Sequence, residues 1–267
     1  MSSPRDAMTP PSYERLRPVT PWASVVLAAN PSSMTLEGTN TWLLRAPDSD
    51  SAIVVDPGPD HDAHLDPVIA AAGRVSQILL THGHIDHSAG ARRLAERTGA
   101  PVRALDGAQR LGTEGLSEGD VVSASGVEVR VWATPGHSRD SVSFVLDDGR
   151  TRSVLTGDTI LGRGTTVVAY PDGELGEYLA SLRRLAELAD ATVLPGHGPE
   201  LASAGVVAQH YLEHRQQRLE QVAAALTQLG PDADARAVVE VVYADVEQRL
   251  WWAAEMSVKA QLAYLER

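Results

Sequence analysis

Three histidines and an aspartate are crowded into one short stretch, THGHIDH, at residues 81–87. Histidine accounts for only 9 of the 267 residues, so this grouping is unusual. The stretch directly follows SQILL at 76–80, an apolar run typical of a buried strand. Imidazoles and carboxylates are side chains that bind divalent metal ions. We therefore interpret His82, His84, Asp86 and His87 as candidate metal ligands.

The same pattern recurs three times further along the chain. His137 ends VWATPGH, Asp158 ends SVLTGD and His197 ends TVLPGH. Each lies shortly beyond the end of a predicted strand, at the edge of an α/β sheet where loops converge to form sites. The seven side chains exceed the four ligands of one tetrahedral ion, so the sequence predicts a site for two metal ions.

The residue types also indicate which ions and which chemistry to expect. The chain contains no cysteine, so only nitrogen and oxygen ligands are available. Zinc suits imidazole and carboxylate ligands, and manganese and iron remain alternatives. A pair of such ions lowers the pKa of a bridging water from about 15.7 to about 7, and the resulting hydroxide can attack a phosphoryl or carbonyl centre. Asp86 and Asp158 are the candidate catalytic carboxylates.

Apolar runs that alternate with helical patterns predict an α/β chain with helices outside paired sheets. Helices are expected at 88–100, with Gly99 as the C-terminal stop, and at 174–189. Strands are expected within eight segments rich in Val, Ile and Leu: 23–29, 39–46, 51–58, 76–82, 126–137, 141–148, 152–158 and 191–197.

Composition divides the chain into three parts. Residues 1–18 are Pro- and Ser-rich and predict a loosely ordered tail, and 19–204 form the main domain. Residues 205–267 predict a small helical domain, with one helix ending at Gly230-Pro231. No segment resembles a signal peptide or approaches the ~20 apolar residues that span a bilayer, so we expect a cytoplasmic protein without membrane contact.

Several polar residues near the predicted strands have two interpretations. In LEGTNT, at 36–41, Asn40 and Thr41 either contact substrate or belong to an ordinary hairpin turn. Thr165 and Thr166 either line the pocket or begin a strand. Asp56, in IVVDPG, is more consistent with a turn or with supporting a metal ligand than with being a ligand itself.

Histidines and aromatic residues elsewhere are treated in the same way. His61 and His64 form either a metal pair or, as we favour, solvated side chains near a helix start. His210 and His214 are expected on the polar face of a helix, from which Tyr211, His214 or Arg215 could reach a substrate. Aromatic side chains in the tail are interpreted as core or homodimer contacts rather than a surface for nucleic-acid bases: Trp251, Trp252 and Tyr264.

Taken together, THGHIDH, TPGH, LTGD and PGHG resemble the ordered motifs of the metallo-β-lactamase superfamily. The resemblance implies an αββα four-layer sandwich. It also implies a role for each candidate ligand: His82, His84 and His137 on the first metal, Asp86, His87 and His197 on the second, and Asp158 bridging both.

Longer stretches are similar to the β-lactamase-like protein 2 group, whose characterised members include a mitochondrial endoribonuclease. They are NPSSMTLEGTNTWLL, TPGHSRDSVSFVL, GDTILGRGTTVV, LPGHGPEL and YLEHRQQR. This resemblance implies a small winged-helix-like C-terminal domain and favours a phosphodiester in single-stranded RNA as substrate.

Three other functions compete with this prediction. A thioesterase of the glyoxalase II type shares the metal motifs, but the tail offers few of the basic residues with which that family binds glutathione. A β-lactamase is disfavoured by the lack of a signal peptide. A non-catalytic nucleic-acid-binding module would leave the intact ligand set unexplained, and the net charge of −12 opposes a protein that coats nucleic acid.

Overall fold

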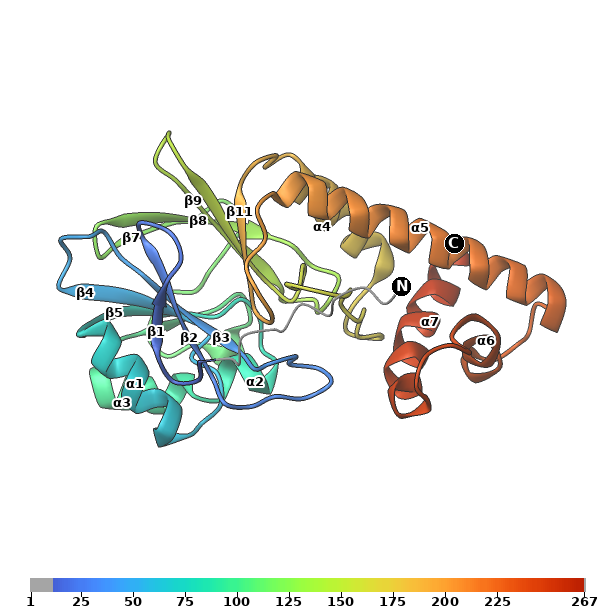
Figure 1. The fold of residues 1–267 in the computed structure, drawn as a ribbon, viewed down its shortest axis with the longest axis horizontal. Coiled ribbons are helices and arrows are strands. Elements are labelled where there is room, and N and C mark those ends of the chain that lie inside the picture. The colour runs from blue at the N-terminus through green and yellow to red at the C-terminus, as the bar shows by residue number, and fades with distance from the viewer. Residues whose placement is uncertain (1–11, 267) are drawn as a thin grey trace, which may run out of the picture.

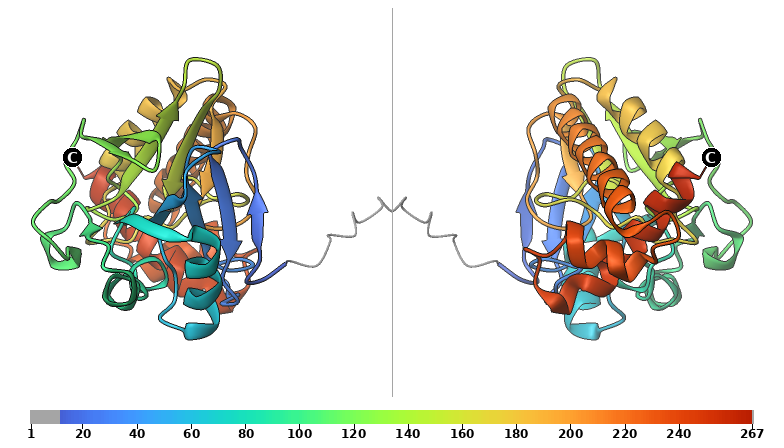
Figure 2. Two further views of the ribbon diagram at one scale, coloured as in Figure 1. Left: turned by 90° about the vertical axis from the view of Figure 1, so that its left-hand side faces the viewer. Right: turned by 90° about the vertical axis from the view of Figure 1, so that its right-hand side faces the viewer.

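The computed structural model describes residues 12–266, which form two stacked β-sheets with helices on both outer faces (Figures 1 and 2). The first sheet contains six strands in chain order: β1 (Leu16–Pro18), β2 (Ala23–Leu27), β3 (Asn40–Leu44), β4 (Ser51–Val55), β5 (Arg74–Leu79) and β6 (Val102–Arg103). The second runs in the order β11-β10-β9-β8-β7: β7 (Val121–Ala124), β8 (Val127–Ala133), β9 (Val142–Asp147), β10 (Arg152–Gly157) and β11 (Thr192–Pro195).

Helices cover the outer faces of both sheets. On the first sheet, α1 (Asp62–Ala72) contacts β4 and β5, and α3 (Ala91–Thr98) contacts β5 and β6. On the second sheet, α4 (Leu175–Ala186) and the long α5 (Ala204–Leu229) pack against each other. The short α2 (Ile85–Ser88) lies at the sheet edge. The expected αββα sandwich is confirmed.

Side-chain alternation explains why the central strands have continuous apolar runs. In β4, Ile53 and Val55 face the second sheet, whereas Ala52 and Val54 face the helices. Because the side-chain period of a strand is two, a strand buried on both faces needs an apolar residue at nearly every position. Phe144 in β9 packs from the other sheet into the same central layer.

The beginning of the chain differs from the expected tail. Residues 1–11 lie outside the described residues, but β1 pairs antiparallel with β2, so residues 16–18 belong to the first sheet. Runs of apolar residues could not predict this strand, because its three residues, Leu-Arg-Pro, are all exposed on an edge of the sheet. For α1, the sequence predicted only a helix start near His61 and His64, and not the extent of the helix.

The C-terminal part is built from helices. The first half of α5 packs in the main core through Ala204, Ala208 and Tyr211, so this core extends beyond the predicted boundary at 204. The second half packs with α6 (Ala235–Val242) and α7 (Trp251–Leu265) around a separate apolar cluster. The helical pattern expected over 234–267 is interrupted between α6 and α7. Within residues 12–266, no helix has the length and apolarity needed to cross a membrane.

Candidate metal centre

Four strand ends meet at one edge of the sandwich. Both β8 and β10 run antiparallel to β9 and β11 runs parallel to β10, so the carboxyl ends of β8, β10 and β11 lie on one side. Their loops carry His137, Asp158 and His197. From the first sheet, the loop after β5 carries His82, and α2 begins directly after His84. An antiparallel bridge between Thr39 and His197 joins the two sheets here.

The structure brings all seven predicted ligands together at this edge. In the first group, the Nδ1 atom of His84 lies 3.0 Å from Nε2 of His82 and 3.0 Å from Nε2 of His137. These three nitrogens therefore converge on one point. His82 and His137 are buried, and His84 is half-buried. The set matches three ligands of a single ion, since its atoms all lie within 4.8 Å of one another.

A second group lies directly beside the first. Nε2 of His197 is 3.2 Å from Nε2 of His87 and 3.1 Å from Oδ2 of Asp86. Asp158 stands between the groups: its Oδ1 is 3.4 Å from both His87 Nε2 and His197 Nε2, and its Oδ2 is 3.8 Å from His137 Nε2. One carboxylate thus faces both groups with different oxygens.

Hydrogen bonds on the opposite ring nitrogens orient the histidines. Nδ1 of His137 donates to the Val167 carbonyl at 2.7 Å, and Nδ1 of His197 donates to the Gly38 carbonyl at 3.1 Å. Donation from Nδ1 leaves the lone pair of a neutral imidazole on Nε2. In their neutral forms both rings therefore present Nε2 lone pairs to the centre, the arrangement in which these nitrogens can bind a metal.

Asp56 supports two further histidines. Its Oδ2 accepts from His87 Nδ1 at 2.9 Å and from the Thr81 hydroxyl at 2.6 Å. Thr81 Oγ1 in turn lies 3.0 Å from Nδ1 of His82 and can accept its proton. Asp56 is 1% exposed and has a φ of +51°, a left-handed conformation. The interpretation of Asp56 as a support for the ligands agrees with this geometry.

Charge is distributed unequally between the two groups. Burial, reinforced by the His87 imidazole, lowers the pKa of His82 well below its usual value, and burial also lowers the pKa of His137. Burial would lower the pKa of His197 too, but the Asp158 carboxylate raises it to about 9. For Asp158, burial raises the pKa, yet His197 and His87 hold it well below its usual range.

The donor set fits divalent cations. Oδ1 of Asp158 is buried without a hydrogen-bond partner among residues 12–266, which is costly unless a cation satisfies it. A side chain at Gly196 would crowd two of the candidate ligands, because its Cβ would lie 2.6 Å from His87 Cε1 and 2.7 Å from Asp158 Oδ1. Neutral imidazoles in one group and carboxylates in the other can hold two positive ions side by side.

Two of the predicted substrate contacts have partners inside the protein. Asn40 donates from its amide to the carbonyls of Pro195 and Gly198, at 3.0 and 2.8 Å. Thr41 is 0% exposed and donates to the Asp56 carbonyl at 2.7 Å. These bonds assign the two side chains to joining strands, which favours the structural alternative. Thr166 lies with Oγ1 3.2 Å from His137 Nδ1, so it is near the centre but 4% exposed.

The remaining histidines and aromatic residues separate into buried and exposed members. His61 is exposed, but His64 is 1% exposed, so the expectation that both are solvated is wrong for His64. The ring of His64 is hydrogen-bonded on both nitrogens.

The residues singled out in the C-terminal helices also differ in exposure. On α5, His210 is exposed and His214 is half-buried, whereas Tyr211 and Arg215 are buried. In the tail Trp251 is buried, while Trp252 and Tyr264 are 50% and 36% exposed.

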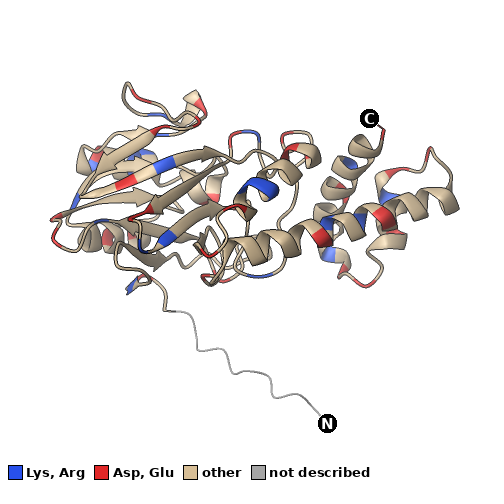
Figure 3. Cartoon of the chain, turned by 90° about the horizontal axis from the view of Figure 1, so that it is seen from above, with Lys and Arg blue, Asp and Glu red and all other residues tan. Residues whose placement is uncertain are grey.

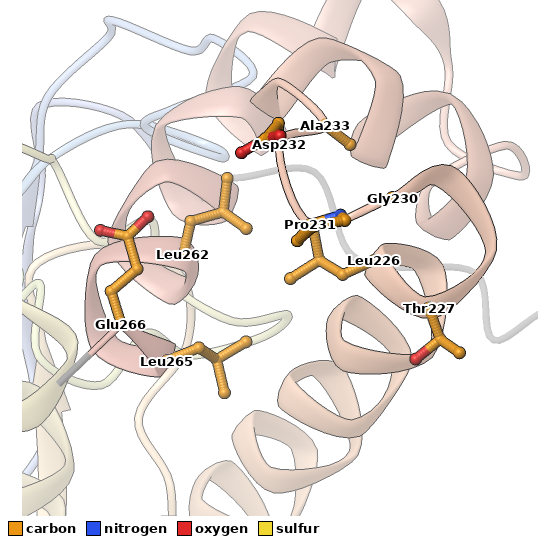
Figure 4. Close-up of a pocket in the computed structure, with 9 residues that line it drawn as sticks. All are labelled: Leu226, Thr227, Gly230, Pro231, Asp232, Ala233, Leu262, Leu265 and Glu266. Atoms are coloured by element: carbon orange, nitrogen blue, oxygen red, sulfur yellow. The ribbon is translucent and has the colours of Figure 1, made fainter.

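Two cavities lie in different parts of the molecule. A cleft of about 570 Å³ opens beside His84, and its lining includes residues that the sequence did not single out: Leu105, Asp106, Gln109, Arg139, Asp140 and Asp172. They come from separate loops, so no local pattern signals them. A second cavity, of about 660 Å³, lies in the C-terminal helices between Leu226 and Leu262 (Figure 4), away from the seven candidate ligands.

Comparisons with known proteins agree with this architecture. The metallo-beta-lactamase superfamily model matches residues 34–197, and that of the beta-lactamase associated winged helix domain matches 235–267. A beta-lactamase-like protein 2 homolog from Drosophila melanogaster is 33% identical over 262 residues, with 91% of this chain and 87% of that protein covered. An atrochrysone carboxyl ACP thioesterase from Aspergillus fumigatus is 33% identical over 210 residues, covering 75% of this chain and 64% of that protein.

Solved structures show the same fold over nearly the whole chain. A beta-lactamase domain protein from Burkholderia ambifaria aligns with a TM-score of 0.79 at 23% identity, covering 97% of this chain and 91% of that one. A protein crystallised in a di-iron-bound form aligns with a TM-score of 0.52 at 27% identity, covering 66% of this chain and 92% of that one. The chain therefore belongs to the metallo-beta-lactamase superfamily and is a hydrolase with a candidate His/Asp metal site and a C-terminal winged-helix domain.

Proposed function

We propose that the seven side chains hold two divalent metal ions. In this assignment one ion takes His82, His84 and His137, the second takes Asp86, His87 and His197, and Asp158 is shared. The convergence of the two groups, with Asp158 Oδ1 between them buried and lacking a hydrogen bond among the described residues, is the observation that carries the proposal. Imidazole ligands favour zinc, although the carboxylates also suit manganese or iron.

Two ions at this place would supply an ionised water as nucleophile and neutralise charge on the scissile group. The protein's own residues then determine how the reaction is organised. Asp86 is the more accessible catalytic carboxylate, with a side chain 26% exposed against 11% for Asp158. Because Oδ2 of Asp86 faces His197 and His87, Oδ1 is the oxygen left to take a proton from an incoming water, while Asp158 holds the two ligand groups together.

For the substrate we propose a phosphodiester of single-stranded RNA. The sequence stretches shared with the β-lactamase-like protein 2 group support this, and the alignment with such a homolog covers 91% of this chain. Arg139 and Arg163 are exposed on the loops that carry His137 and follow Asp158, where guanidinium groups can contact phosphates. Each also has an acidic neighbour: Asp172 for Arg139 and Glu37 for Arg163.

A thioester is the second candidate, and one observation favours it. The cleft beside His84 is lined by three carboxylates, Asp106, Asp140 and Asp172, against the single guanidinium of Arg139. Such a lining repels a polyanion and accepts a neutral or cationic group more readily. The related Aspergillus protein is named as an acyl carrier protein thioesterase.

One substrate panel separates these proposals. Purified protein, with and without a chelator, is offered single-stranded RNA, an S-acyl glutathione, an acyl carrier protein thioester and a chromogenic β-lactam. We expect RNA cleavage that requires metal, is lost in Asp158→Ala and is kept in Asp190→Asn, a substitution at an exposed position. Turnover confined to a thioester would reject the RNA assignment, and activity that survives both chelation and Asp158→Ala would reject the metal mechanism.

A further inference from the structure

The N-terminal segment reaches into the interior beside the metal centre. Glu14 has a φ of +56°, and its Oε1 accepts the backbone N–H of Ala29 at 2.9 Å. Its own N–H donates to the Leu27 carbonyl at 2.9 Å. These bonds fix Glu14 against β2, so that Oε2 meets Nδ1 of the buried His64 at 2.6 Å. An edge segment of the chain thus delivers a carboxylate to an interior histidine.

From His64 a line of hydrogen bonds continues to the turn after β4. Nε2 of His64 lies 2.8 Å from the Thr41 hydroxyl, which donates to the Asp56 carbonyl at 2.7 Å. A hydroxyl has only one proton, so Nε2 of His64 is the donor to Thr41. Glu14, His64 and Thr41, which we call the relay, therefore act on the main chain of Asp56.

The residue at the end of the relay determines the position of two candidate ligands. Asp56 bonds directly to His87 and, through Thr81, supports His82. Its left-handed backbone is an unfavourable conformation for a residue with a side chain, so surrounding bonds must hold it. Gly58 leaves room for the relay, since a Cβ there would lie 3.2 Å from Nε2 of His64.

We propose that Glu14, His64 and Thr41 are positioning residues that fix the Asp56 turn and thereby orient His87 and His82 for metal binding. This inference rests on the proposed ligand assignment. It gives Thr41 a role in place of the predicted substrate contact, and it makes Glu14, just before β1, part of the apparatus that binds metal. Because the relay acts through Asp56 and touches no substrate, its effect belongs to metal affinity.

The test uses paired substitutions and a zinc titration. Thr41→Val removes the hydroxyl at constant shape, and Thr41→Ser keeps it. Glu14→Ala removes the carboxylate, and Glu14→Gln keeps an acceptor for Ala29 and a partner for His64. Arg17→Gln is the matched control, because it breaks the surface ion pair with Glu200 in the same segment without touching the relay. Zinc affinity and stoichiometry are measured by competition with a chromophoric chelator, and thermal unfolding of the metal-free protein checks folding.

We expect wild type, Arg17→Gln and Thr41→Ser to bind two zinc ions alike. Thr41→Val and Glu14→Ala should bind the ion held by His87, the ligand that Asp56 contacts directly, about tenfold more weakly, at the low end of the range for residues that orient a ligand. Glu14→Gln should restore most of this affinity. Unchanged zinc affinity in Thr41→Val and Glu14→Ala would overturn the relay, even if their unfolding temperatures fall. An equal loss in Arg17→Gln would also overturn it. Failure of the wild type itself to bind two ions would instead overturn the ligand assignment and the relay together.

Discussion

The metal centre and the C-terminal helices are organised by different forces. In the centre, buried imidazoles have fixed hydrogen-bond partners, and Asp158 Oδ1 is buried without one among the described residues. In the C-terminal helices, α5, α6 and α7 bury an apolar cluster that includes Val222, Val239 and Val258. Acidic and basic residues are interspersed over both parts (Figure 3).

This difference teaches where substitutions should affect chemistry and where they should affect only stability. Removing one partner from a buried polar group leaves the other uncompensated, which costs far more than the bond itself contributed. Removing a methyl group from an apolar cluster has a graded cost that depends on how well the site collapses. The centre should therefore respond to the identity of single atoms, and the helices to volume.

Removing the shared carboxylate of Asp158 should have the largest effect of all on turnover. Asp158→Asn keeps the side-chain volume but removes the charge that faces both ligand groups. We expect turnover of the active panel substrate to fall by roughly 10²-fold or more, as for loss of a preorganised charge-stabilising group. Steady-state kinetics measure this, with Asp190→Asn as control. A decrease of less than twofold would show that Asp158 does not organise the centre.

A single methyl group beside the ligands should have the next largest effect. Gly196→Ala places a Cβ against His87 and Asp158, and we expect it to lower the metal content and the free energy of unfolding by about 1–3 kcal/mol. Gly107→Ala is the matched control, because its Cβ would meet nothing within 4 Å. Metal analysis and denaturant unfolding check both variants. If Gly196→Ala retained the full metal content, the crowding argument would be contradicted.

The same kind of truncation in the C-terminal cluster should leave the chemistry intact. Val239 is 0% exposed, so Val239→Ala should lower the free energy of unfolding by about 2 kcal/mol while the metal content stays unchanged. Val241 is 42% exposed, so the control Val241→Ala should change the free energy of unfolding by less than about 0.5 kcal/mol. Denaturant titration and metal analysis give both values. Loss of metal in Val239→Ala would mean that the two regions are coupled.

The smallest effect concerns acid stability. Burial lowers the pKa of His214 from 6.5 to about 4, so its neutral form is favoured by folding. Its contribution is present above pH 6.5 and is lost as the pH falls from 6.5 to about 4. Because the side chain is half-exposed, we expect less than about 1 kcal/mol. Denaturant unfolding should show a shallower pH slope in His214→Gln than in His210→Gln; identical slopes would refute this contribution.

Local patterns predicted the strands, the α/β class and the convergence of the candidate ligands, and the resemblance to the superfamily implied the αββα sandwich. Eight apolar runs gave strands at the expected places, and the side chains that follow them meet because parallel strand ends share an edge. The pattern failed where partners are distant in the chain. Glu14 and His64 are 50 residues apart, and neither carries a local signal that it will be paired in the interior.

Asn40 shows that a polar residue beside a predicted site can have its partners inside the protein. A turn-like neighbourhood next to a predicted site suggested a contact with substrate, but its amide bonds to carbonyls at residues 195 and 198. That outcome depends on how the start of β3 meets the end of β11 and the loop after it, and this contact is set by packing of the two sheets. The cleft residues Gln109 and Arg139 were missed for the same reason.

The central claim is that this chain holds two metal ions in adjacent groups of ligands. Native mass spectrometry of the zinc-loaded protein tests it most directly, with His84→Ala and Asp86→Ala each removing a ligand from one group only. The account predicts two ions per chain in the wild type and a lower occupancy in each variant. A single ion per chain in the wild type, unaffected by one of the two substitutions, would contradict it.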